Sequence, residues 1–185
     1  MRTSSEFEQL IKSRTFVSKI LWFALTFSIL IYVFVAYQVA LQNTDTEPAE
    51  LNAMFKQIMY AVAAATVCGS LIARAVLFSE SRLKNMLQST DEQMSSGESD
   101  KISANELRAL GLFARLFTPY IVILAINESV VIYGLILSFM AHRGDEILPF
   151  ALAAIVLNAT MFGKLAAAIR QGLELLEDPR FGRRG

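Results

Sequence analysis

One ionisable side chain interrupts a long apolar stretch of this sequence. Glu128 lies near the middle of the run YIVILAINESVVIYGLILSF, residues 120–139. A charge at the centre of a bilayer is costly, so a carboxyl group there is expected to have a function or a partner. Apolar surroundings favour its neutral form, and a carboxyl poised in this way can take up and release a proton. Glu128 is therefore the first candidate for chemistry, as an ion-binding side chain.

Further polar residues within the apolar runs are candidates for the same ion-binding site. They are Ser129, Tyr133, Asn158 and Thr66. We expect the first three to hold the hydrogen bonds of the carboxyl group. Thr66 lies at the matching depth of another apolar run.

A structural interpretation of Glu128 stays open beside the functional one. In it the acid remains protonated and hydrogen-bonds Asn158, Thr66 or Thr160 across a helix bundle. Such bonds within membranes average well under about 2 kcal/mol, so they are a weak reason to keep an acid. Lys164, whose long side chain can reach toward the interface, is a second and weaker candidate partner.

The apolar residues, 54% of the 185, are concentrated in four long runs. These runs cover residues 20–41, 57–73, 117–140 and 147–163. A membrane-spanning helix needs roughly 20 apolar residues, and each run reaches that length with its flanks. The first run is too long for the apolar core of a signal peptide and has no clear cleavage site after it. We therefore expect an all-α integral membrane protein of four helices, arranged as two transmembrane hairpins.

The distribution of Lys and Arg predicts the orientation of these hairpins. Basic residues precede the first run, fill the connection between the second and third, and follow the fourth. The other two connections carry TDTEPAE and HRGDE, which are acidic or mixed. Because basic connections stay in the cytoplasm, we expect both termini to be cytoplasmic, in a bacterial inner membrane.

The chain divides into three parts by composition. Residues 1–88 form the first hairpin, residues 89–103 a polar cytoplasmic linker, and residues 104–185 the second hairpin. The sequences S-x-x-E at Ser5 and Ser103 predict helix starts, because serine and glutamate at this spacing cap a helix reciprocally. Pro48 and Pro149 suit the first turns of the second and fourth helices.

The two hairpins resemble each other in sequence, which suggests a duplication. Aligning Arg14 with Arg115 places Ser28 on Ser129 and Tyr32 on Tyr133. A shorter alignment places TVCGSLIA of the second run on TMFGKLAA of the fourth. Such internal repeats are common in membrane proteins, and here the carboxylate is present in only one copy.

Small residues recur at every fourth position along the second and fourth helices. The residues predicted to serve helix packing are Ala61, Ala65, Gly69, Ala73, Ala159, Gly163 and Ala167. Small side chains let helix backbones approach closely, which drives association where lipid removes the hydrophobic force between helices. We therefore expect the second and fourth helices inside the bundle and the bulkier first and third helices outside.

The segment NESVVIYGLILSF resembles the carboxylate helix of the rotor-ring proteolipids of rotary ATPases. In that family a membrane carboxylate is followed by a small residue and then by Tyr-Gly-Leu, as in Glu128, Ser129 and residues 133–135 here. The central hairpin also has the family's order, a small-residue helix before the carboxylate helix. The resemblance implies reversible protonation or sodium binding at Glu128 within a homo-oligomeric ring that turns past a stator. A proton is favoured, because only Thr66 stands where a second sodium ligand is usual.

Two functions remain as hypotheses. The first is a proteolipid-like subunit that translocates protons, and less plausibly sodium, through Glu128. The second is a non-transporting scaffold or assembly protein whose linker and termini dock a cytoplasmic partner. The sequence contains no soluble-enzyme motif, and its single histidine, His142, lies in an outer connection, so we expect no histidine-based metal site. We expect lipid contact, no cofactor and no nucleic-acid partner, and at most a subunit role in an ATPase-like enzyme.

Overall fold

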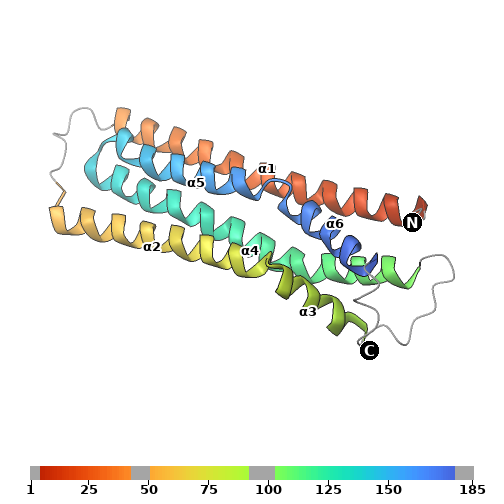
Figure 1. Ribbon diagram of the computed structural model, residues 1–185. Helices are drawn as coiled ribbons and strands as arrows, with labels where there is room; N and C mark the ends of the chain where they lie inside the picture. Colours follow the sequence, from red (N-terminus) through yellow and green to blue (C-terminus); the bar gives the residue numbers. More distant parts are fainter. Residues whose placement is uncertain (1–4, 43–50, 92–102, 178–185) are drawn as a thin grey trace. The chain divides into compact units, whose positions relative to one another are not determined.

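The computed structural model describes residues 5–42, 51–91 and 103–177, and all regular structure in these ranges is helical. The elements are α1 (Ser5–Gln42), α2 (Ala53–Leu77), α3 (Glu80–Asp91), α4 (Ala104–Ala141), the short 3₁₀ helix η1 (Gly144–Ile147), α5 (Leu148–Met161) and α6 (Lys164–Glu177) (Figure 1). Four segments are long and apolar enough to cross a bilayer: Phe7–Gln42, Ala53–Leu77, Glu106–Ala141 and Gly144–Leu176. The predicted all-α class with four candidate spans is confirmed.

The start of α4 follows the predicted capping chemistry. The backbone N–H of Ser103 donates to Glu106 Oε2 at 2.8 Å, and the backbone N–H of Glu106 donates to Ser103 Oγ at 3.3 Å. This reciprocal pair is the capping box predicted for α4. Pro149 is the second residue of α5, as expected, whereas Pro48 lies outside the described residues.

Two helices that the sequence analysis did not anticipate are α3 and α6. Phe78 and Ser79 separate α3 from α2, and Phe162 and Gly163 separate α6 from α5. Gly163 has φ +75, a left-handed conformation that glycine adopts readily and that commonly ends a helix. Residues 89–91 of the predicted linker belong to α3, and residues 92–102 lie outside the described part of the chain.

Contacts divide the chain into two compact units, and each takes segments from both predicted hairpins. One unit, here called the terminal unit, comprises residues 1–20, 74–121 and 162–185. The other, the central unit, comprises residues 21–73 and 122–161. The predicted division into hairpins follows chain order and stays a prediction.

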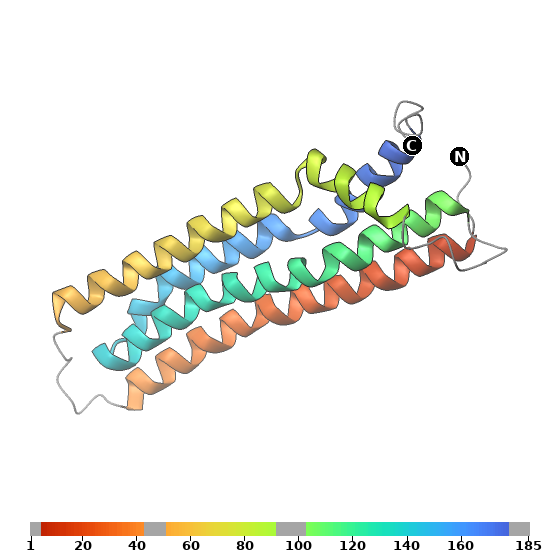
Figure 2. The ribbon, with the colours of Figure 1, turned by 90° about the horizontal axis from the view of Figure 1, so that it is seen from below.

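In the central unit, α4 and α5 are the enclosed helices. The candidate spans differ in the share of their most apolar 18 residues that is buried. This share is 44% for the span that contains α4 and 39% for the span that contains α5, but only 22% for α2 and 11% for α1. Figures 1 and 2 show the four segments of this unit alongside one another. Their shared core consists of Ile29, Ala36, Ala63, Val130, Val131, Leu137, Ile147, Phe150, Ala151, Ala154 and Leu157.

The terminal unit is built around the first half of α4. Phe7 of α1 packs with Ala109 and Leu110 of α4, and the Arg14 guanidinium lies 5.7 Å from the ring centre of Phe113. Arg115 Nη1 donates to the carbonyl of Met86 on α3 at 3.2 Å. Helices α3 and α6 also contact each other, so these two short helices cover α4 in this unit.

The small residues predicted to serve helix packing lie mostly on the surface of a single copy. Ala61, Ala65 and Gly69 on α2 are exposed, and a Cβ built on Gly69 would meet no atom within 4 Å. Ala159, Gly163 and Ala167 are exposed too, and Ala73 is half-buried. The large side chains of α4 and α5, rather than these small ones, fill the interior, because α4 is the helix that other helices surround.

Candidate ion-binding site

The carboxyl group of Glu128 is held by two hydroxyl groups of another helix. Ser28 Oγ donates to Glu128 Oε1 at 2.5 Å, and Tyr32 OH donates to the same oxygen at 3.1 Å. Ser28 and Tyr32 are four residues apart on α1, so a straight helix presents both on one face. Glu128 itself is half-buried on α4, within the central unit. The site is therefore a carboxyl group of α4 that two hydrogen bonds hold against α1.

The hydroxyl of Ser28 lies between two acceptors. Its Oγ is 2.7 Å from the carbonyl oxygen of Leu25, one turn earlier on α1, as well as close to Glu128. A serine hydroxyl carries one proton and two lone pairs, so it can donate to only one of these acceptors at a time. If Ser28 donates to Leu25, its oxygen is free to accept a proton from a protonated Glu128. Rotation of one hydroxyl thus suits the site to either charge state.

A second polar group lies on a different side of α4. Ser70 Oγ of α2 donates to Asn127 Oδ1 at 2.6 Å, and Asn127 Nδ2 donates to Asn158 Oδ1 of α5 at 2.8 Å. All three residues are buried. Trp22 Nε1 of α1 donates to the backbone carbonyl of Asn158 at 2.7 Å. This network joins four helices by hydrogen bonds that lipid cannot replace.

Asn127 and Glu128, which are consecutive in α4, therefore form hydrogen bonds with different helices. Asn127 faces α2 and α5, whereas Glu128 faces α1, as expected for side chains about 100° apart around a helix. Asn158 Nδ2 is buried with no hydrogen-bond partner among the described residues. The amide network and the carboxyl site are thus two separate clusters of polar side chains in the central unit.

The residues predicted to surround Glu128 are placed elsewhere. Ser129 Oγ donates to the carbonyl of Ile126 on its own helix at 2.7 Å, and Thr66 Oγ1 donates to that of Val62 at 2.9 Å. Asn158 belongs to the amide network, and Tyr133 packs against the central core. In the described part of the chain, none of these four makes a hydrogen bond to Glu128.

The sequence contained a signal for the partners that were missed. Ser28 and Tyr32 are the residues that the repeat alignment places on Ser129 and Tyr133. Serine and tyrosine at this spacing thus occur on both helices, and sequence spacing within one helix does not say which helix packs on which face.

The described residues contain no group of three or more His, Cys, Asp or Glu that could hold a metal ion. Within the same residues Glu128 has no ion pair, and Lys164 is exposed and belongs to the terminal unit. The polar contacts of Glu128 described here come from neutral hydroxyl groups only. No family model matches the chain, and neither the curated proteins nor the solved structures include a significant match.

Proposed function

We propose that this protein is an integral membrane subunit that takes up and releases a proton at Glu128. One observation carries the proposal: the Ser28 hydroxyl lies between Glu128 and the Leu25 carbonyl. With Glu128 ionised, Ser28 and Tyr32 both donate to it. With Glu128 protonated, Ser28 turns to Leu25 and its oxygen accepts the acid proton. A cycle between the two states needs no movement of the backbone.

The chemistry of the contacts favours a proton over sodium. A serine and a tyrosine oxygen meet one carboxylate oxygen here, and a cation bound in hydrocarbon needs several more oxygen ligands. The amide oxygens that could supply them bond to other groups: Asn127 Oδ1 accepts from Ser70, and Asn158 Oδ1 accepts from Asn127. The proposal therefore keeps the proton as the transported ion.

We further propose that the protein works as a homo-oligomer. Translocation requires Glu128 to exchange protons with each side in turn, as in a proteolipid ring that turns past a stator. The exposed small-residue face of α2 offers a surface on which a second copy could pack closely. A cytoplasmic or stator partner belongs to the same proposal.

Reaction with a hydrophobic carbodiimide tests the proposal, because only a protonated carboxyl group in an apolar setting reacts readily. The full-length protein in nanodiscs is labelled over a range of pH, and the modified residue is found by mass spectrometry. We expect labelling at Glu128 at a rate that falls as pH rises, and none in Glu128→Gln. Absence of labelling in folded protein, or a rate independent of pH, contradicts the proposal.

The second candidate is a scaffold in which Glu128 is a permanently neutral acid. One observation favours it: both hydroxyls donate to the same oxygen, Oε1, which a glutamine would also provide. On this account Glu128→Gln keeps full function in the cell. On the proton-carrying account Glu128→Gln folds normally but loses function.

A further inference from the structure

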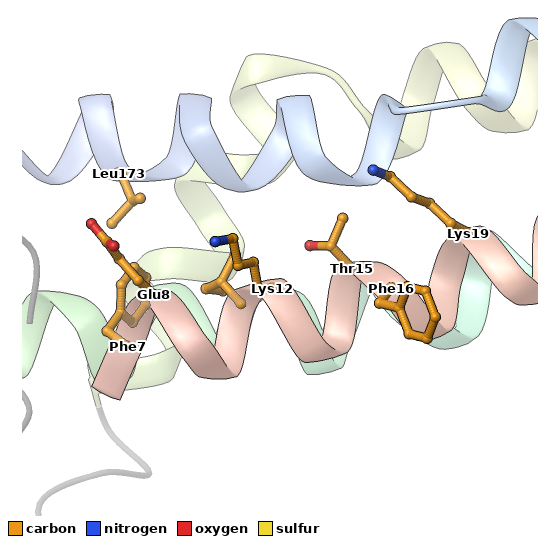
Figure 3. A pocket seen from close by; sticks show the side chains of 8 residues that line it. Phe7, Glu8, Lys12, Thr15, Phe16, Lys19 and Leu173 are labelled. Atoms are coloured by element: carbon orange, nitrogen blue, oxygen red, sulfur yellow. The ribbon is translucent and has the colours of Figure 1, made fainter. Parts of the chain in front are cut away.

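A hollow in the terminal unit combines positive charge with an apolar wall. It is an open hollow between the first turns of α1 and the last turns of α6, with a volume of about 520 Å³ (Figure 3). The residues that line it are Phe7, Glu8, Ile11, Lys12, Thr15, Phe16, Lys19 and Leu173. Its volume falls in the range of about 300–1,000 Å³ that is usual for small-molecule sites.

The polar side chains of the hollow suit an anion. Lys12 and Lys19 are exposed, and Thr15 lies between them along α1. A phosphate group between the two lysines would neutralise their positive charge. The one acidic side chain, Glu8, lies at the opposite end of the row from Lys19 in Figure 3.

The apolar side chains of the hollow suit hydrocarbon rather than water. Phe7 is buried beside Leu173, and Phe16 is 63% exposed next to the lysines. Lys19 directly precedes the first apolar run at residue 20, so we expect the Lys19 end of the hollow at the level of the lipid headgroups. Lys and Arg at this level attract anionic lipids, and basic pockets between helices bind their headgroups.

We propose that this hollow binds the phosphate headgroup of an anionic membrane lipid, with its first chain carbons against Phe16. The site is independent of Glu128, because all its lining residues belong to the terminal unit. A bound lipid would join α1 to α6 within that unit. It would thereby stabilise the short helix that follows the break at Gly163.

Thermal unfolding of the full-length protein in a neutral detergent tests this site. Phosphatidylglycerol is added to one sample, phosphatidylcholine with the same chains to a second, and inorganic phosphate to a third. We expect phosphatidylglycerol alone to raise the unfolding temperature. Native mass spectrometry should show the same lipid retained on the protein.

The double variant Lys12→Gln/Lys19→Gln should bind phosphatidylglycerol about twenty-five-fold more weakly, since each lysine near an anionic lipid contributes roughly fivefold. The matched control Arg82→Gln/Lys164→Gln removes the same charge at exposed positions outside the hollow and should bind as the wild type does. Because the readout is the effect of added lipid, a change in the basal stability of either variant does not obscure it.

Three results would overturn the proposal. An equal rise in unfolding temperature with phosphatidylcholine would show that the acyl chains of the lipid alone occupy the hollow. Equal stabilisation by inorganic phosphate would make it a site for the free anion. Undiminished binding of phosphatidylglycerol to the Lys12/Lys19 double variant would place the lipid elsewhere.

Discussion

At the scale of single residues, the polar chemistry of α4 is divided between two neighbouring side chains. Asn127 is fully buried, and its side-chain amide forms hydrogen bonds with Ser70 and Asn158, which hold α4 against α2 and α5. Glu128 is half-buried and contacts hydroxyls of α1 only. The amide is thus the structural member of the pair, and the acid is the one that can change charge.

Removal of the hydroxyl donors should disfavour the ionised acid. In Ser28→Ala or Tyr32→Phe, Glu128 should react faster with the carbodiimide than in the wild type, at a pH where wild-type labelling is slow. The ionised acid loses a hydrogen bond to a charged group, about 1.5–3 kcal/mol, whereas the protonated acid loses at most a neutral one, about 0.5–1.5 kcal/mol. The labelling rate measured in nanodiscs at that pH gives the comparison.

Ser129→Ala is the matched control, because the Ser129 hydroxyl donates to Ile126 in its own helix. Its labelling rate should equal that of the wild type. If all three variants behave alike, the contacts of Ser28 and Tyr32 do not govern the protonation of Glu128.

At the scale of helices, close approach occurs where α4 meets α5. A Cβ added to Gly134 would lie 2.8 Å from Phe150 Cβ and 2.8 Å from Phe150 Cδ2. The first of these atoms is fixed to the backbone, so rotation of the ring cannot relieve the overlap. Gly134 therefore lets α4 and α5 pack against each other, whereas Gly69 on α2 has open space around it.

The two glycines give a paired prediction for stability. Gly134→Ala should destabilise the protein by about 1–3 kcal/mol, the usual cost of overpacking a filled core. Gly69→Ala should be neutral or slightly stabilising, because alanine is the better helix former and meets no atom. Thermal unfolding in detergent measures both, and an unchanged unfolding temperature for Gly134→Ala would refute the close packing.

The sequence predicted helices well and their neighbours poorly. Long apolar runs fixed the four candidate spans, and the capping box at Ser103 fixed the start of α4, because both signals are local. The contact of Glu128 with Ser28 depends on which face of α4 meets α1, and no local pattern contains that information. The polar segments that became α3 and α6 were missed because they are too short and too polar to stand out as apolar runs.

At the scale of the whole molecule, the surface of α2 is the feature that bears on assembly. A Cβ added at Gly69 meets no atom of the described residues within 4 Å, so we expect a single copy to tolerate a larger side chain there. In a homo-oligomer packed on this face, the same side chains would hold two backbones apart.

Gly69→Leu should therefore weaken the oligomer while leaving the fold of each copy intact. The control is Ala64→Leu, an equally exposed position on a different side of α2. Native mass spectrometry of the two variants and the wild type in detergent gives the subunit number. An oligomer unaffected by Gly69→Leu would mean that copies associate through another surface, and a monomeric wild type would exclude the homo-oligomer.

The central claim, that Glu128 exchanges a proton within the membrane, is tested most directly by infrared spectroscopy of the protein in nanodiscs across a pH titration. The spectrum of Glu128→Gln is subtracted, which isolates the carbonyl stretch of the protonated Glu128 carboxyl group. We predict a band that is present at low pH, disappears as pH rises and returns when pH is lowered again. A band that persists unchanged at every pH at which the protein stays folded would make Glu128 a permanently neutral structural acid and would contradict the account.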